Sequence, residues 1–190
     1  MKKRIFALVV CVCALAVFAC AFSPASANTK AVAAKPENGV LKARFQNMLN
    51  RNFVYNADFE NADVVTENAI LALLDKRDAE NPDYISTAVV TDFVKDMYGI
   101  EIVDVRQDES VYKEGYIYIM PRGFTAYENK VENIAANEDG SFTVTSSVTV
   151  FPHDGEQFIT KGETLFVPNA ESAFGYSIIY SNLKGVASGI

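Results

Sequence analysis

The sequence predicts an α+β protein in which three N-terminal helices pack on one face of a curved antiparallel sheet of five to six strands. Apolar residues recur at helical spacing up to about residue 98 and alternate with polar residues after it. Turn sequences such as Asn137–Gly140 separate the alternating segments, and strands joined by short turns run antiparallel. Because each helix has a single apolar stripe, all three are expected to cover the same face of the sheet.

Three segments have the apolar spacing of helices that bury one side. The first covers residues 40–52, and the second covers residues 66–78 with Thr66 as its N-cap. The third begins after Ser86 and ends before Gly99, a residue suited to the left-handed conformation that follows a helix. This third helix has the clearest pattern, with buried positions expected at Val89, Val90, Phe93, Val94 and Met97.

Alternation of apolar and polar residues predicts the strands. It is clearest between Phe142 and Phe151, where Phe142, Val144 and Val148 face one way and threonines face the other. The predicted strands are residues 100–105, 116–120, 124–137, 142–151, 158–167 and 176–181.

The N-terminus has the three parts of a secretory signal. Lys2–Arg4 is basic, Ile5–Phe22 is apolar, and Ala25–Ala27 is an A-x-A cleavage pattern. We therefore expect a signal peptide at 1–27, a linker at 28–38 and a single domain at 39–190, exported by a bacterium. Two alternatives stay open: an uncleaved membrane anchor, or a lipoprotein carrying its lipid on Cys20. Each reading predicts an extracytoplasmic protein, secreted or held in the cell envelope.

Signal removal changes the composition of the chain that folds. The full sequence has 17 Lys+Arg, 24 Asp+Glu and a net charge of −7. Residues 1–27 hold three of the basic residues, no acidic residue and all 3 cysteines, so the remainder has a net charge of −10. The mature domain is expected to fold on its own core without disulfides, and no membrane span should remain after cleavage.

The same inventory excludes several classes of chemistry. Without cysteine the mature chain has neither a thiol nucleophile nor a thiolate metal site, and its 1 histidine cannot form a His–His metal pair. The acidic balance argues against nucleic acid as a partner. The sequence contains neither a dinucleotide-binding nor a triphosphate-binding glycine motif, so we predict no cofactor.

The negative charge is concentrated between residues 58 and 114. These residues hold 15 acids and 5 bases, which fits either solvated helix faces or a surface for a basic partner or cation. Asp58, Glu60 and Asp63 are candidate calcium ligands, although their spacing is not that of an EF-hand.

The best candidate binding residues are Tyr116, Tyr118, Arg122 and Tyr127, where aromatic rings and a guanidinium fall close together in the sequence. The other interpretation is that these rings belong to the core and only their hydroxyls reach solvent. The single histidine, His153, lies in Pro152–Gly155, which reads as an exposed turn rather than part of a catalytic triad.

The order of elements in residues 39–182 resembles the nuclear transport factor-like and cystatin-like α+β folds. The resemblance rests on element order and implies a curved sheet around the helices. In such folds a pocket between sheet and helices often binds a small molecule, whereas some members are interaction modules only. The sequence therefore favours a non-enzymatic binding or interaction module for a protein or small-molecule ligand. The alternative is a small hydrolase or isomerase that uses carboxylate or tyrosine groups in a cone-shaped pocket.

Overall fold

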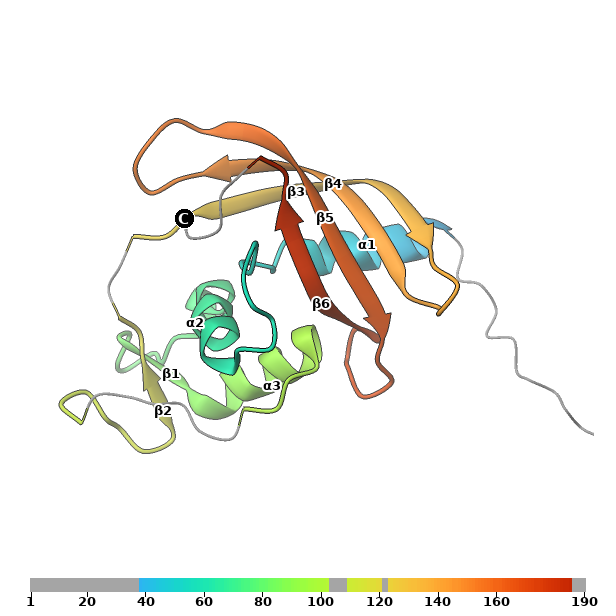
Figure 1. The fold of residues 1–190 in the computed structure, drawn as a ribbon. Coiled ribbons are helices and arrows are strands. Elements are labelled where there is room, and N and C mark those ends of the chain that lie inside the picture. The colour runs from blue at the N-terminus through green and yellow to red at the C-terminus, as the bar shows by residue number, and fades with distance from the viewer. Residues whose placement is uncertain (1–37, 103–108, 121–122, 186–190) are drawn as a thin grey trace, which may run out of the picture. The chain divides into compact units, whose positions relative to one another are not determined.

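Three helices precede the main sheet, as the sequence predicts (Figure 1). The structure is a computed structural model that describes residues 38–102, 109–120 and 123–185. The helices are α1 (Asn38–Leu49), α2 (Ala62–Ala72) and α3 (Thr87–Tyr98), with a 3-10 turn η1 (Leu74–Lys76) after α2. The predicted signal peptide and all but the last residue of the predicted linker lie outside the described residues.

The helix caps differ in how well the sequence locates them. Helix α3 has Ser86 at its N-cap position and Gly99 just past its end at φ 69°, as predicted. Helix α2 starts four residues before the predicted cap, Thr66, because Asn61 caps it instead: the Asn61 side chain accepts hydrogen bonds from the N–H groups of Asp63 and Val64. Thr66 lies inside the helix and donates its hydroxyl to the Ala62 carbonyl at 2.6 Å.

Six strands are present in the described chain, but they form two sheets instead of one. The main sheet has four antiparallel strands in the order β3 (Ala126–Ala136), β4 (Phe142–Phe151), β5 (Phe158–Pro168) and β6 (Tyr176–Leu183). A second sheet pairs β1 (Tyr84–Ser86) with β2 (Tyr116–Tyr118).

The predicted single sheet of five to six strands is therefore wrong in extent, while the α+β class is confirmed. The three residues of β1 are too few to produce an alternating pattern, so no local signal predicts that β2 pairs with β1 and not with the main sheet. Residues 100–102 of the first predicted strand are not in a strand, and the rest of that segment lies outside the described residues.

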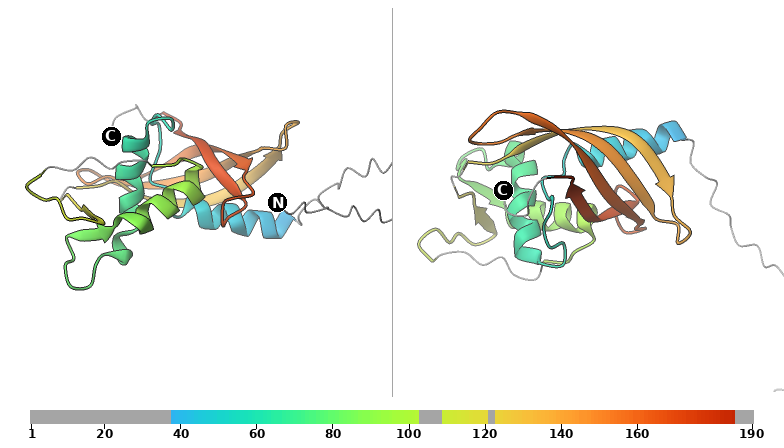
Figure 2. Two further views of the ribbon diagram at one scale, coloured as in Figure 1. Left: turned by 90° about the horizontal axis from the view of Figure 1, so that it is seen from below. Right: turned by 45° about the horizontal axis from the view of Figure 1, so that its top comes forward.

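The helices lie on the concave side of the main sheet, which curves over them (Figures 1 and 2). Helix α1 contacts β3 and α3 contacts β6, the two edge strands, while α2 packs on α3. Both edges of the sheet thus have a helix beside them, which limits the pairing of an open edge with another chain.

Phe45 of α1 anchors the apolar core between helix and sheet. Its side chain is fully buried, and its ring centroid lies 4.2 Å from that of Phe166, 5.1 Å from that of Tyr176 and 5.6 Å from that of Phe142. Three strands and α1 therefore meet in one aromatic cluster. Two apolar residues of the predicted helices are exposed: Val40 at the start of α1, at 56%, and Val89 in α3, at 37%, so the expected burial of Val89 is wrong.

A polar layer lies beside this cluster, on the inner face of the sheet. Asn52 accepts a hydrogen bond from the Tyr98 hydroxyl at 3.1 Å and donates to Ser181 Oγ at 3.3 Å. Asn129 of β3 accepts from the Tyr55 hydroxyl at 2.8 Å. Among the described residues no buried side-chain polar atom lacks a hydrogen-bond partner, so this layer is satisfied internally.

Candidate functional site

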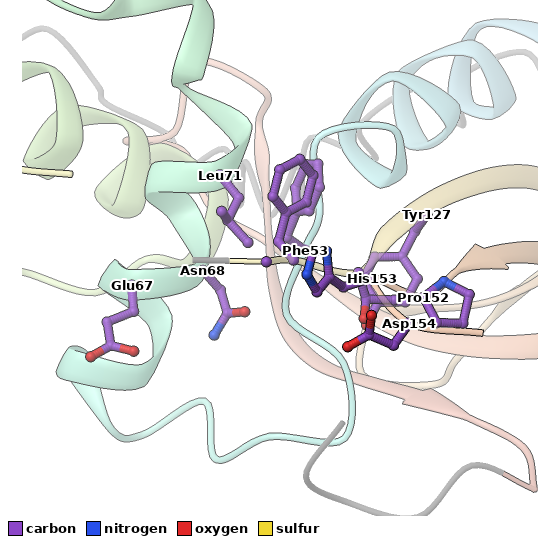
Figure 3. A pocket seen from close by; sticks show the side chains of 11 residues that line it. Phe53, Glu67, Asn68, Leu71, Tyr127, Pro152, His153 and Asp154 are labelled. Carbon is purple, nitrogen blue, oxygen red and sulfur yellow. The ribbon is translucent and has the colours of Figure 1, made fainter. Parts of the chain in front are cut away.

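A pocket of about 470 Å³ opens between α2 and the connection from β4 to β5 (Figure 3). It lies within the usual size range of ligand sites, about 300 to 1,000 Å³. The lining residues come from α2, from the α1–α2 connection, from β3 and the segment before it, and from the β4–β5 connection. They are Phe53, Glu67, Asn68, Leu71, Gly123, Phe124, Thr125, Tyr127, Pro152, His153 and Asp154.

The two sides of the pocket differ in their origin. Figure 3 shows Glu67, Asn68 and Leu71 of α2 on one side, and Tyr127 with the β4–β5 connection on the other. Glu67, Asn68 and Leu71 project together because residues three and four apart on a helix lie on the same face. The pocket thus joins segments that are far apart in sequence, since its first and last lining residues are Phe53 and Asp154.

Tyr127 forms the most ordered part of the pocket wall. Its ring centroid lies 4.6 Å from that of Tyr55 and 6.3 Å from that of Phe53, and the ring packs on Val148, Val150 and Leu183. Partial burial raises the pKa of the Tyr127 hydroxyl above its ordinary value. These contacts hold the ring in place and leave it facing the pocket.

The β4–β5 connection closes against the segment that enters β3. The imidazole of His153 lies so near the backbone of Gly123 that a β-carbon at residue 123 would be 2.2 Å from the ring. Only glycine allows this approach without displacing the side chain. The contact places the sole histidine of the chain at the pocket wall, while its side chain stays exposed as predicted for a turn residue.

The described lining is acidic. Glu67 and Asp154 are both exposed, and the described lining residues include no lysine or arginine. Aromatic and aliphatic side chains provide the remaining wall, together with the amide of Asn68 and the hydroxyl of Thr125. This mixture suits a ligand with an apolar body and a few polar groups.

The structure separates the four residues that the sequence singled out. Tyr127 lines the pocket, whereas Tyr116 and Tyr118 do not: they lie on one face of β2, opposite buried Ile117. Tyr118 contacts Tyr84 with ring centroids 5.5 Å apart. Arg122 lies outside the described residues, next to Gly123 in the sequence.

The second tyrosine group has its own cation. Lys113 Nζ lies 3.9 Å from the ring centroid of Tyr116 and 5.3 Å from that of Tyr84, so a cation–π contact covers these rings. One side of these tyrosine rings is therefore already in contact with a lysine of the same chain.

Sequence reasoning missed Phe53, Glu67 and Asn68 as site residues. Each belongs to a local pattern, a helix face or a polar connection, that looks the same with or without a pocket beside it. The described chain holds no group of three or more His, Cys, Asp or Glu side chains placed to bind a metal, so the calcium hypothesis for Asp58, Glu60 and Asp63 gains no support. Instead, Asp58 Oδ1 accepts the Glu60 N–H at 2.9 Å, which closes a local turn.

Over the described residues, no helix is both long and apolar enough to cross a membrane. Comparison of the chain with protein-family models, with curated protein sequences and with solved structures gave no significant match. The chain is an α+β protein with three helices under a curved four-stranded sheet and a pocket lined by aromatic and acidic residues.

Proposed function

We propose that the protein is a non-enzymatic binding module of the bacterial cell envelope and that the pocket beside Tyr127 is its recognition site. The observation that carries this proposal is the pocket of about 470 Å³ itself, with the half-buried Tyr127 ring fixed in its wall by Tyr55 and Phe53. The envelope location rests on the predicted signal at residues 1–27.

The Tyr127 hydroxyl is partly desolvated but open to water, since no fully buried side-chain polar atom among the described residues lacks a partner. A ligand atom that accepts or donates a hydrogen bond at Tyr127 would take the place of that water. The ring needs no rearrangement to do so, because it is held by contacts with Tyr55 and Phe53.

Binding fits the geometry of the pocket better than catalysis does. General acid–base chemistry needs a side chain held in place by an orienting hydrogen bond. In the described chain His153 and Asp154 are exposed and form no hydrogen bond or ion pair with each other. The alternative, a small hydrolase or isomerase, would use Glu67, Asp154 and Tyr127, which share this pocket.

The expected ligand is a small molecule or a side chain of a partner protein. Arg122 immediately precedes the lining residue Gly123, and we propose that it also contacts the ligand. Tyr116 and Tyr118, which lie on β2, are proposed as a separate partner-binding surface.

His153 makes the proposal directly testable, because it is the only histidine in the chain and lines the pocket. Its imidazole proton signals in an NMR spectrum of the untagged protein form a unique reporter. We expect members of a fragment library to move these signals, and Tyr127→Phe to weaken the binding of the best fragments about threefold to tenfold. The matched control is Tyr180→Phe, which removes an exposed hydroxyl from β6.

Two results would count against the binding module. If no fragment moves the His153 signals, the pocket is not a recognition site. If Tyr127→Phe and Tyr180→Phe leave affinity equally unchanged, the hydroxyl has no role in recognition. Turnover of a fragment that is lost in Glu67→Gln or Asp154→Asn would favour the enzyme instead.

A further inference from the structure

We infer that the pocket selects ligands that present a flat aromatic ring, in preference to ligands with an aliphatic group of the same size. This inference rests on the proposed binding function and adds the chemical class of the ligand. It is carried by three aromatic side chains of the lining and by the angle at which two of them are held.

The three rings reach the pocket from two separate parts of the chain. Phe53 belongs to the connection between α1 and α2, whereas Phe124 precedes β3 and Tyr127 lies in it. Each residue keeps surface open to solvent: Phe124 is 41% exposed, and Phe53 and Tyr127 are half-buried. A ligand that covers these rings removes apolar surface from water.

Phe53 and Tyr127 form a corner in this lining. Their ring centroids are 6.3 Å apart, and the planes of the two rings meet at 70°. A flat ring that lies parallel to one of them is therefore nearly perpendicular to the other. Offset stacking and edge-to-face contact are the two arrangements that aromatic pairs prefer, so one ligand ring can make both contacts in this corner. The corner exists before binding, because Tyr55 also packs on Tyr127, with ring centroids 4.6 Å apart.

An aliphatic group gains only part of this stabilisation. A cyclohexyl group is similar in size to a phenyl group and buries a similar apolar area, so the hydrophobic contribution is common to both. It has no π-face and lacks the additional attraction between aromatic rings. Leu71 of α2, on the other side of the pocket, can contact either kind of group (Figure 3). The expected preference therefore depends on the rings and on no charged group of the pocket.

Two uncharged alcohols of similar shape test this selectivity. One is 2-phenylethanol, which carries an aromatic ring, and the other is 2-cyclohexylethanol, its saturated counterpart. We would titrate each into the untagged full-length protein and follow the imidazole signals of His153, which lines the pocket. We expect the aromatic alcohol to bind about threefold to tenfold more tightly than the saturated one.

Replacing phenylalanine by leucine assigns the preference to particular rings. Phe53→Leu and Phe124→Leu should each lower the aromatic-to-saturated affinity ratio about twofold or more. Because Phe124 is exposed, its variant decides the question if Phe53→Leu fails to fold. The matched control is Phe158→Leu, which removes a ring that is 38% exposed and does not line the pocket. If the control lowers the ratio equally, or neither lining variant lowers it, these rings do not set the preference and the inference is wrong.

A second pair of probes separates the two sources of an aromatic ring. Blocked phenylalanine (N-acetyl-phenylalanine methylamide) and its cyclohexylalanine counterpart present the same two groups on a peptide backbone. Blocked phenylalanine binding more tightly than 2-phenylethanol assigns the site to a side chain of a partner protein, and the reverse order assigns it to a small molecule. Both orders support the inference, provided that each aromatic probe binds more tightly than its saturated counterpart.

The outcomes distinguish this inference from the proposed function. If the saturated probes bind as tightly as the aromatic ones, the ligand class is wrong and the binding function stands. If none of the probes moves the His153 signals, both proposals are overturned.

Discussion

The Gln46 side chain of α1 accepts a hydrogen bond from the backbone N–H of Val131 in β3 at 2.9 Å. Its Nε2 donates to the carbonyl of Asn129 at 2.6 Å, so a helix amide pairs with this edge strand as a neighbouring strand would. Since β3 is the first strand of the main sheet, this pairing satisfies backbone groups that would otherwise lie at its open edge. It also ties α1 to one position along β3.

Replacing Gln46 tests how much this pairing stabilises the fold. Gln46→Ala should lower the free energy of unfolding by about 1–3 kcal/mol, because the N–H of buried Val131 and the carbonyl of buried Asn129 both lose their partner. The measurement is urea denaturation followed by circular dichroism. Asn47→Ala, at an exposed position of the same helix, should leave stability unchanged or raise it slightly. Equal effects of the two variants would show that the paired amide adds no stability.

Replacing Gly123 tests the contact between its backbone and the His153 imidazole at the pocket wall. Gly123→Ala should displace the His153 ring, because the new β-carbon would lie 2.2 Å from it. Stability should fall by less than about 1 kcal/mol, since both residues are exposed and the imidazole can move. The His153 proton shifts should change and ligand-induced shifts should weaken. Gly39→Ala is the control, as a β-carbon there would meet nothing within 4 Å. Unchanged His153 signals in Gly123→Ala would contradict the contact.

Buried tyrosines should make the protein unstable in alkali. Burial raises the pKa of Tyr55 and of Tyr98 above the ordinary value of 10.0. Below pH 10 each hydroxyl is protonated in both folded and unfolded chains and adds no pH dependence. Above it only the unfolded chain loses these protons, so the free energy of unfolding should fall by about 1.4 kcal/mol per pH unit for each tyrosine.

The variants Tyr55→Phe and Tyr98→Phe separate these contributions. Each should be less stable than the wild type at neutral pH, because Asn129 or Asn52 loses a hydrogen bond. Each should also lose about 1.4 kcal/mol per pH unit of the alkaline slope. Denaturant titrations between pH 9 and 12 measure the slope, with exposed Tyr180→Phe as the control. A slope unaffected by both core variants would mean that these hydroxyls ionise in the folded state.

The predicted signal at residues 1–27 can be tested by the N-terminus of the native protein. We expect the native protein to begin at Asn28, because Ala25–Ala27 matches a signal-peptidase site. Intact-mass spectrometry of the protein isolated from its native source measures the start of the chain. A chain that begins with a lipid-modified Cys20 would instead identify a lipoprotein, and an unprocessed Met1 would identify an anchor.

Local patterns predicted the parts of the fold that depend on local physics. The alternation of apolar and polar residues from Phe142 to Phe151 predicted the bounds of β4. The apolar residues at helical spacing, followed by Gly99, predicted the end of α3. It was harder to predict which of two nearby polar residues caps a helix. Asn61 and Thr66 are both good caps, and only the geometry of the chain before α2 decided between them.

The candidate site was predicted only in part, since Tyr127 lines the pocket and its neighbours in the prediction do not share it. Tyr116 and Tyr118 do share a strand face as expected, but β2 pairs with β1, a three-residue strand with no sequence signal. His153 was correctly placed in an exposed connection, but its approach to Gly123 depends on two segments about 30 residues apart.

The sequence by itself determined the α+β class, the order of the helices and main strands, and the acidic composition without cysteine after residue 27. These properties follow from hydrophobic periodicity and charge, which are set within a few residues of the chain. Only the tertiary structure decided that six strands divide into two sheets, that Gln46 pairs with an edge strand, and that Tyr127 meets α2 and His153 around one pocket. Each of these features depends on contacts between residues that are far apart in sequence, and local sequence patterns do not predict such contacts.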